Sequence, residues 1–242
     1  MQNKSLIVTD LVKEYGGRKV VNGLSLHINP GEIVGLLGPN GAGKTTAFYM
    51  ISGLIRPDSG TVHFSGQDVT FMPMHERAKL GLGYLTQEPS IFRELTVEEN
   101  ILTVLETRNL DQTDLKLRLD ALLNELELTH LRKKRAQTLS GGERRRLEIT
   151  RSLAAEPSCL MLDEPFANVD PIAIADLRSI IRRLSDRGIA ILITDHNARE
   201  IFSVVQRSYL VSEGCVLLSG TVEELLENKE ARRKYFGEEF SI

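Results

Sequence analysis

Short apolar runs separated by turn residues make up the first part of the chain. Residues 6–8 are apolar, residues 20–28 alternate between apolar and polar, and residues 61–64 lie between two Ser-Gly pairs. Runs of this length and period predict short antiparallel strands. Residues 159–162 and 189–194 are apolar almost throughout, which predicts strands buried on both faces of a parallel sheet. We therefore expect an α/β fold with an antiparallel sheet beside the parallel one.

Helical spacing dominates residues 89–156. Thr96 and Glu99 fit a capping box at the start of one helix. The next helix has leucines on one face. They are Leu115, Leu119, Leu122, Leu123 and Leu126. We interpret residues 89–156 as a helical subdomain inserted into the α/β core, so that residues 1–242 form a single domain.

The last third of the chain returns to the α/β pattern. Asp170 and Pro171 are typical of the N-cap and the first position of a helix. Two short apolar runs further on predict a hairpin. Thr221 and Glu224 then predict a capping box for a last helix, within a C-terminal tail of residues 220–242.

The segment 38–46 fits the motif G-x-x-x-x-G-K-[ST], between an apolar strand-like run at 33–37 and a helical pattern at 47–54. Glycines let such a loop curl around an anion and point backbone N–H groups at it, and the following helix adds its positive end. Lys44 can reach the β- and γ-phosphates, and the Thr45 hydroxyl can bind Mg²⁺. The predicted nucleotide-binding residues here are Gly38, Pro39, Asn40, Gly41, Ala42, Gly43, Lys44, Thr45 and Thr46.

Asp163 and Glu164 directly follow the apolar run 159–162. Parallel sheets place their sites at the carboxyl ends of strands. Asp163 can therefore hold Mg²⁺ opposite Thr45, while Glu164 can polarise a water in line with the γ-phosphate. A solvated acidic turn is the alternative for this pair taken alone, and the phosphate-loop motif upstream favours the catalytic interpretation.

Ser140, Gly141, Gly142 and Glu143 precede a helical run at 144–155. An N-cap serine followed by glycines is compatible with an ordinary helix start. The same residues also offer bare amides, a hydroxyl and the positive end of a helix, which is a second anion site. Two such sites in one chain suggest that two copies share nucleotide between them.

Composition narrows the class of protein. The chain has 242 residues and a net charge of −3, which argues against a general nucleic-acid binder. The basic runs 132–135 and 144–146 are then better interpreted as solvated helix faces. Cys159 and Cys215 are far apart, which favours a reducing compartment over a disulfide framework. With no signal-peptide pattern and no membrane-spanning apolar run, we expect a cytosolic chain whose membrane role would come through a partner.

The order of these motifs, with Gln87 and His196 among them, resembles the nucleotide-binding domain of ABC transporters over nearly the whole chain. The resemblance implies a P-loop NTPase (RecA-like) core with an antiparallel β subdomain and a helical subdomain. It also implies that the protein uses ATP and Mg²⁺, hydrolyses ATP, and forms a head-to-tail homodimer that encloses two ATP molecules.

The resemblance also implies roles for individual residues. Tyr15 would stack on adenine, and Asp170 would belong to a loop that crosses the dimer interface. Gln87 would contact Mg²⁺ and the attacking water, and His196 would contact the γ-phosphate. Together with the residue-based predictions, the catalytic set is Glu164, His196 and Gln87; the metal set is Thr45, Gln87 and Asp163; and the set that binds nucleotide from the second copy is Ser140, Gly141 and Gly142.

Two positions depart from the family pattern. Glu143 stands where many members have glutamine, and we expect it to be ion-paired with the neighbouring arginines rather than near nucleotide. Asn168 stands where a small or leucine-type residue is common, so the backbone of that loop is not predicted.

Within the family, the chain resembles the ATPases of lipopolysaccharide-export transporters, notably in residues 35–50, 83–93, 139–146 and 193–197 and in its tail. This implies two integral-membrane partner subunits, contacted near Phe92 and Arg93, and a position on the cytoplasmic face of an inner membrane. The lipopolysaccharide would be handled by the complex and not by this chain. The ATPases of branched-chain amino-acid importers share the Leu-Ser-Gly-Gly-Glu segment and are the alternative.

Other nucleotide-binding classes fit less well. An ABC ATPase of the chromosome or repair type would need a long coiled-coil insertion, and a translation-type member would carry two cassettes. A small GTPase would need an Asn-Lys-x-Asp segment, which the sequence lacks.

Overall fold

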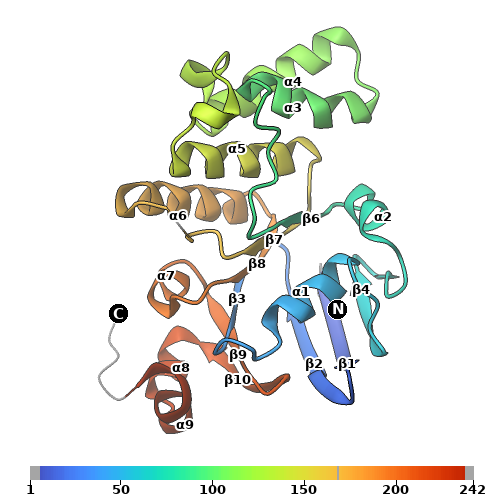
Figure 1. Cartoon of the computed structure of the whole chain (residues 1–242), viewed down its shortest axis with the longest axis vertical. Helices are drawn as coiled ribbons and strands as arrows, with labels where there is room; N and C mark the ends of the chain where they lie inside the picture. Colours follow the sequence, from blue (N-terminus) through green and yellow to red (C-terminus); the bar gives the residue numbers. More distant parts are fainter. Residues whose placement is uncertain (1–5, 168, 238–242) are drawn as a thin grey trace.

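A six-stranded sheet forms the centre of the molecule, with helices on both sides of it (Figure 1). The computed structural model describes residues 6–167 and 169–237. Neighbouring strands of this sheet are parallel, except that the two strands latest in the sequence form an antiparallel hairpin at one edge. In spatial order the strands are β10 (Cys215–Thr221), β9 (Arg207–Ser212), β3 (Ile33–Leu37), β8 (Ala190–Thr194), β7 (Cys159–Asp163) and β6 (Leu82–Leu85).

Three of the inner strands, β3, β7 and β8, are buried at all five of their positions. Their sequences are apolar on both alternating faces, as a strand covered on both sides requires. The predicted buried strands at 159–162 and 189–194 are thus confirmed, with β7 extended to Asp163. Because β3, β7 and β8 run parallel, their carboxyl ends meet at one edge of the sheet.

A second sheet of four strands lies beside the first and is antiparallel. Its strands are β2 (Arg18–Ile28), β1 (Leu6–Tyr15), β4 (Ser59–Phe64) and β5 (Gln67–Asp68). This confirms the predicted antiparallel sheet, although β1 and β2 are longer than the short apolar runs suggested. Helix α1 (Lys44–Ser52) packs between the two sheets, where Phe48 and Met50 are fully buried.

Three helices from the segment 89–156 gather at one end of the molecule (Figure 1). They are α3 (Val97–Leu105), α4 (Gln112–Glu125) and α5 (Gly141–Ala154), with 3₁₀ turns at Glu106–Arg108, Thr129–Leu131 and Ala136–Thr138. The predicted capping box of Thr96 and Glu99 is confirmed at the start of α3. Apolar residues of α3, α4 and α5 continue into the core beneath α6 (Pro171–Asp186). Asp170 caps α6 and Pro171 is its first residue, as predicted.

Short helices complete the fold. They are α2 (Met74–Lys79), α7 (Ala198–Phe202), α8 (Val222–Glu227), α9 (Lys229–Ala231) and a π-helical turn at Arg232–Phe236. The capping box of Thr221 and Glu224 is confirmed, but α8 is not the last helix. Asn228 ends it and caps α9 by accepting hydrogen bonds from Glu230 N and Ala231 N. The Phe236 ring then packs on Phe202 of α7, with ring centroids 5.3 Å apart.

Candidate active site

The segment 38–46 turns directly from β3 into α1, which confirms the predicted strand, loop and helix. The helix begins at Lys44, three residues earlier than the apolar pattern suggested, because Gly43 serves as its N-cap in a left-handed conformation with φ 98°. A Cβ at Gly43 would overlap the Val20 carbonyl oxygen. Among the described residues, no side chain caps α1, so the first amides of the helix are left for another acceptor.

The Lys44 ammonium lies almost buried at the centre of the loop. It donates hydrogen bonds to Gly38 O at 2.7 Å and to Pro39 O at 3.0 Å. Burial lowers the pKa of Lys44, against the attraction of the Glu164 and Asp163 carboxylates and of Asp195. The cation is therefore placed where acidic groups converge, and it is held by carbonyls that an incoming phosphate can replace.

Asp163 ends β7 with only 2% of its surface exposed. The Tyr84 hydroxyl donates to Asp163 Oδ2 at 3.1 Å, and burial raises the pKa of Asp163. A buried carboxylate with a single hydroxyl donor is poorly compensated, and a cation would stabilise it.

Glu164 follows in a left-handed conformation with φ 44°, which is uncommon for a residue other than glycine. Its N–H donates to Thr194 O of β8 at 2.8 Å, which fixes this turn to the neighbouring strand. Gln87 Nε2 donates to Glu164 Oε2 at 2.8 Å, and His196 Nδ1 lies 3.5 Å from the same oxygen. The three residues predicted as catalytic thus meet at one carboxylate.

A pocket of about 230 Å³ opens beside these groups. It is lined by Val20, Asn40, Gly41, Gly43, Lys44, Thr45, Thr46, Asp163, Glu164 and Thr194. Most of the predicted loop residues face it. Gly38 and Pro39 instead present their carbonyls to Lys44, and Ala42 is buried behind the loop. The Tyr15 side chain, 52% exposed at the end of β1, is outside this set of lining residues.

Two lining residues, Val20 and Thr194, were not predicted. Thr194 ends an apolar strand next to Asp195 and His196, so its place at the carboxyl edge of the sheet was a usable signal. Val20 comes from an antiparallel strand of the second sheet, and only the tertiary packing of that sheet brings it to the loop.

Ser140 is the N-cap of α5 and is outside the set of residues that line this pocket. Its hydroxyl accepts from Glu143 N at 3.3 Å, and the Glu143 carboxylate accepts from Ser140 N at 2.7 Å. The expectation that Glu143 is ion-paired with the neighbouring arginines is wrong, because its carboxylate closes this capping box. The Ser140 N–H bond also holds the pKa of Glu143 below its usual range.

The interpretation of residues 144–146 as a solvated face is wrong for Arg145, which is only 6% exposed. Its guanidinium donates to Asp163 O at 3.1 Å, Pro165 O at 3.2 Å and Thr86 O at 3.2 Å, and pairs with Glu148 at 2.7 Å. Arg145 thereby ties α5 to the ends of β7 and β6, next to Gln87. Asn168, the other position left open by the sequence, lies outside the described residues.

Phe92 is half exposed on the loop after β6, so it is not a core residue. Asn100 holds its backbone, accepting from Phe92 N at 2.9 Å and donating to Phe92 O at 2.9 Å. The Arg151 guanidinium lies 4.8 Å from the centre of the Phe92 ring. This places an exposed aromatic ring, on a backbone held by Asn100 and with a cation against it, at the surface of the segment that follows β6.

No helix in the described part of the chain is both long enough and apolar enough to cross a bilayer.

Comparisons with known proteins agree with this geometry. Residues 21–167 match the family described as ABC transporter. An uncharacterised ABC transporter ATP-binding protein of Rhizobium meliloti is 54% identical over 240 residues, covering 98% of this chain and 88% of the relative. The lipopolysaccharide export system ATP-binding protein LptB of Haemophilus influenzae is 50% identical over 238 residues, covering 98% and 99%. A crystal structure of an ATP-binding cassette of an ABC transporter, in its ADP conformation, superposes with a TM-score of 0.86 at 28% identity, covering 97% and 99%.

Proposed function

The chain belongs to the ABC transporter family, and we propose that it is the ATP-hydrolysing subunit of a lipopolysaccharide-export transporter. Its enzymatic class follows from the family: the chain is an ATP-binding cassette that hydrolyses ATP. The observation that carries the export assignment is near-full-length identity of about half to LptB proteins.

The triphosphate binds over the first turn of α1. Lys44 exchanges Gly38 O and Pro39 O for the β- and γ-phosphates, while the uncapped amides of the loop and helix surround them. Tyr15 lies exposed at the end of β1, where its ring can stack on adenine.

The residues present fit a magnesium ion. Asp163 is a buried carboxylate whose pKa is raised by burial, and the Thr45 hydroxyl lines the same pocket. Across the described residues there is no cluster of three or more acidic, histidine or cysteine side chains suited to a tightly held metal. Mg²⁺ bound with nucleotide needs only one or two carboxylates from the protein, and phosphate oxygens and water supply most of its other ligands. Thr45, Asp163 and Gln87 would hold it, and it would neutralise charge on the phosphates.

Glu164 acts as the general base. Its carboxylate takes a proton from water as the water oxygen bonds to the γ-phosphorus and the bond from that phosphorus to the bridging oxygen of ADP breaks. Gln87 donates to Glu164 Oε2, and His196 lies close to the same atom, so both orient the base. The strained backbone of Glu164, fixed by Thr194 O, keeps the carboxylate at the pocket.

A second copy of the chain completes the site. The first turn of α5, with Ser140, Gly141 and Gly142, is outside the set of residues that lines this chain's own phosphate pocket. Its glycine amides are still available to an anion, and Ile172 beside Asp170 is 82% exposed. A head-to-tail homodimer would place this helix start against the γ-phosphate bound by the partner and would cover Ile172.

The exposed ring of Phe92, with Arg93 next to it, contacts the integral-membrane subunits. This contact would hold the chain on the cytoplasmic face of an inner membrane. Phe92→Ala should abolish assembly with the membrane subunits. The matched control is Leu117→Ala on α4, which also removes an exposed apolar side chain and should leave assembly intact. Normal assembly of the Phe92 variant would remove this contact from the proposal.

The export assignment is tested by isolating the tagged chain from its native membranes with mild detergent. The copurifying membrane proteins are identified and the bound lipids are analysed by mass spectrometry. Export predicts two integral-membrane subunits and bound lipopolysaccharide, enriched when Glu164→Gln blocks turnover. Permeases of an amino-acid importer without lipopolysaccharide would support the branched-chain alternative and end the proposal.

A further inference from the structure

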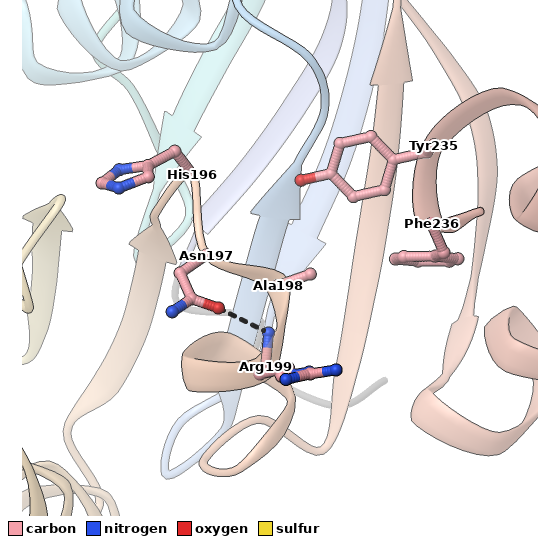
Figure 2. Close-up of a pocket in the computed structure, with 6 residues that line it drawn as sticks. All are labelled: His196, Asn197, Ala198, Arg199, Tyr235 and Phe236. Carbon is pink, nitrogen blue, oxygen red and sulfur yellow. Dashed lines mark hydrogen bonds between the residues drawn. The ribbon is translucent and has the colours of Figure 1, made fainter. Parts of the chain in front are cut away.

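Two hollows border the active site. The larger, of about 470 Å³, lies between the start of α7 and the rings of Tyr235 and Phe236 (Figure 2). Of the three predicted catalytic residues, all in the described part of the chain, only His196 lines it. The smaller, of about 160 Å³, lies where α5 meets the segments that follow β6 and β7, and both Gln87 and Glu164 line it. Helix α5 therefore borders the catalytic base of its own chain.

Two charged residues of α5, Arg145 and Glu148, line the same small cavity. They are only 6% and 3% exposed, and Arg145 Nη1 lies 2.7 Å from Glu148 Oε2. Glu148 Oε1 is buried and has no hydrogen-bond partner among the described residues, so the pair is not fully compensated. Apolar side chains of similar volume often stabilise a protein at least as well as a buried ion pair. Stability alone therefore does not account for this pair, and the other contacts of the guanidinium become the relevant ones.

All three guanidinium nitrogens of Arg145 donate to the backbone beside the catalytic residues. Nη2 donates to Asp163 O at 3.1 Å and Nε donates to Pro165 O at 3.2 Å, and these are the carbonyls on either side of Glu164. Nη1 also donates to Thr86 O at 3.2 Å, in the residue that precedes the catalytic glutamine. One planar, rigid group thus spans the two segments whose side chains meet at the carboxylate of the base.

The turn at Glu164 depends on such support. Its left-handed backbone, with φ 44°, persists only where the surrounding contacts fix it. The Glu164 N–H donates to Thr194 O at 2.8 Å, and the Ala167 N–H donates to Glu164 O at 3.2 Å. The carbonyls of the residues before and after it both accept from Arg145. Loss of the guanidinium would therefore release two of the three carbonyls in 163–165 and let the carboxylate shift.

We propose that Arg145 is a positioning residue for ATP hydrolysis: by holding the carbonyls around Glu164 and before Gln87, it keeps the base and its hydrogen-bond partner aligned with α5. Ser140 caps the same helix. The helix that would contact the nucleotide of the partner copy therefore also sets the base of its own chain. A small displacement of a base is enough to slow a reaction strongly, because catalysis depends on geometry close to that of attack. The inference rests on the proposed function in that Glu164 is the base.

The test compares Arg145→Lys with wild type and with Arg207→Lys. Lysine keeps the charge beside Glu148, but its compact ammonium cannot reach three carbonyls at once. Arg207 is a matched control, because it pairs with Glu32 and donates to His27 O at the amino end of β9, away from the carboxyl edge of the sheet. We expect kcat to fall roughly 10- to 100-fold for Arg145→Lys, with KM for ATP unchanged within about twofold. Both constants should stay at wild-type values for Arg207→Lys.

A second variant covers the case in which lysine does not fit the buried site. Arg145→Gln combined with Glu148→Gln removes both charges, so neither is left unpaired. The glutamine amide has two N–H groups and cannot hold all three carbonyls. We again expect a lower kcat with KM unchanged, and thermal unfolding verifies that each variant is folded.

A second readout separates positioning of the base from a general structural role. If Arg145 acts through Glu164, adding Arg145→Lys to a Glu164→Gln chain should lower the remaining turnover by less than about twofold. The Kd for ATP, from calorimetry, should be the same in both Glu164→Gln chains. A wild-type kcat in the folded variants, a rise in KM as large as the fall in kcat, or an equal loss with and without Glu164 would overturn the inference. Unchanged turnover in the Glu164→Gln parent would overturn the proposed function instead.

Discussion

Helices α1 and α5 both begin at glycine-rich turns, but their first turns are finished differently. At α1, Gly43 is the N-cap and, among the described residues, no side chain satisfies the exposed amides. At α5, Ser140 and Glu143 close a complete capping box. One helix start therefore depends on a ligand to complete it, while the other satisfies two of its amides within its own chain and leaves those of Gly141 and Gly142 for an anion.

The surroundings of the two helix starts repeat this contrast. Three buried charged groups lie at the start of α1: Lys44, Asp163 and Asp195. Burial lowers the pKa of Lys44 and raises the pKa of both carboxyl groups, so in each case it favours the neutral form. Beside α5, Arg145 is compensated by Glu148 and by three backbone carbonyls. We infer that the α1 side holds buried charges whose cost is relieved when a ligand binds. The α5 side, in contrast, is a rigid surface that binds another molecule.

The largest expected effect is that of Glu164→Gln, which should separate binding at α1 from chemistry. The amide cannot take the proton from water, so turnover should fall by roughly 10²- to 10⁴-fold. The side-chain oxygen of the new glutamine can still accept the hydrogen bond from Gln87, so ATP affinity should stay near wild type. Phosphate release and calorimetric titration measure the two quantities. Unchanged turnover would remove Glu164 as the base.

Ser140→Ala should produce the next largest effect and tests whether α5 has a role beyond its own chain. Loss of the cap should cost about 0.5–2 kcal/mol in the free energy of unfolding. Turnover should also fall, by roughly 10- to 100-fold, as expected for loss of a donor to transition-state charge. Thr96→Ala is the matched control, because it opens the same kind of capping box on α3. This control should lower the free energy of unfolding by a similar amount and leave turnover unchanged. Equal losses of turnover in both variants would assign Ser140 a purely structural role.

Asp163→Asn is the test on folding stability: it should stabilise the folded chain, although it also removes a proposed magnesium ligand. Folding raises the pKa of Asp163, so the folded state binds this proton more tightly than the unfolded state and ionisation opposes folding. The penalty is absent below the unfolded pKa of about 3.9 and grows as pH rises through the folded value. Removing the carboxylate should add roughly 0.5–2 kcal/mol at pH 7.

Urea unfolding in a metal chelator at pH 7 and near pH 4.5 measures this difference. The gain should shrink at the lower pH. A loss of stability at pH 7 would contradict the interpretation that this side of the site holds buried charges at a cost.

Glu143→Gln should have the smallest effect. Glutamine can close the same capping box, so stability should change by less than about 0.5 kcal/mol and turnover by less than about twofold. Thermal unfolding and phosphate release measure both. A large loss of turnover with unchanged stability would show that the carboxylate acts on nucleotide, contrary to the structure.

The α1 side of the site could be predicted from the sequence because its chemistry is local. A nine-residue motif, and a carboxylate pair after an apolar strand, fix their own conformations and the edge of the sheet on which they lie. The convergence of Gln87 and His196 on Glu164 was different, because it depends on strands β6, β7 and β8 lying side by side. Family resemblance supplied those two residues where periodicity could not.

The features that sequence patterns missed all depend on contacts between distant segments. Arg145 looked like part of a solvated basic run, yet it is buried because it meets carbonyls that follow β6 and β7. Val20 reaches the phosphate pocket through the packing of the two sheets.

The most direct test of the account is a structure of the Glu164→Gln chain with ATP and Mg²⁺ in excess. We expect a closed homodimer in which each triphosphate contacts Lys44 of one copy and the α5 start, at Ser140, of the other. A closed dimer with ATP in the pocket and Ser140 of the second copy turned away from the γ-phosphate would contradict it.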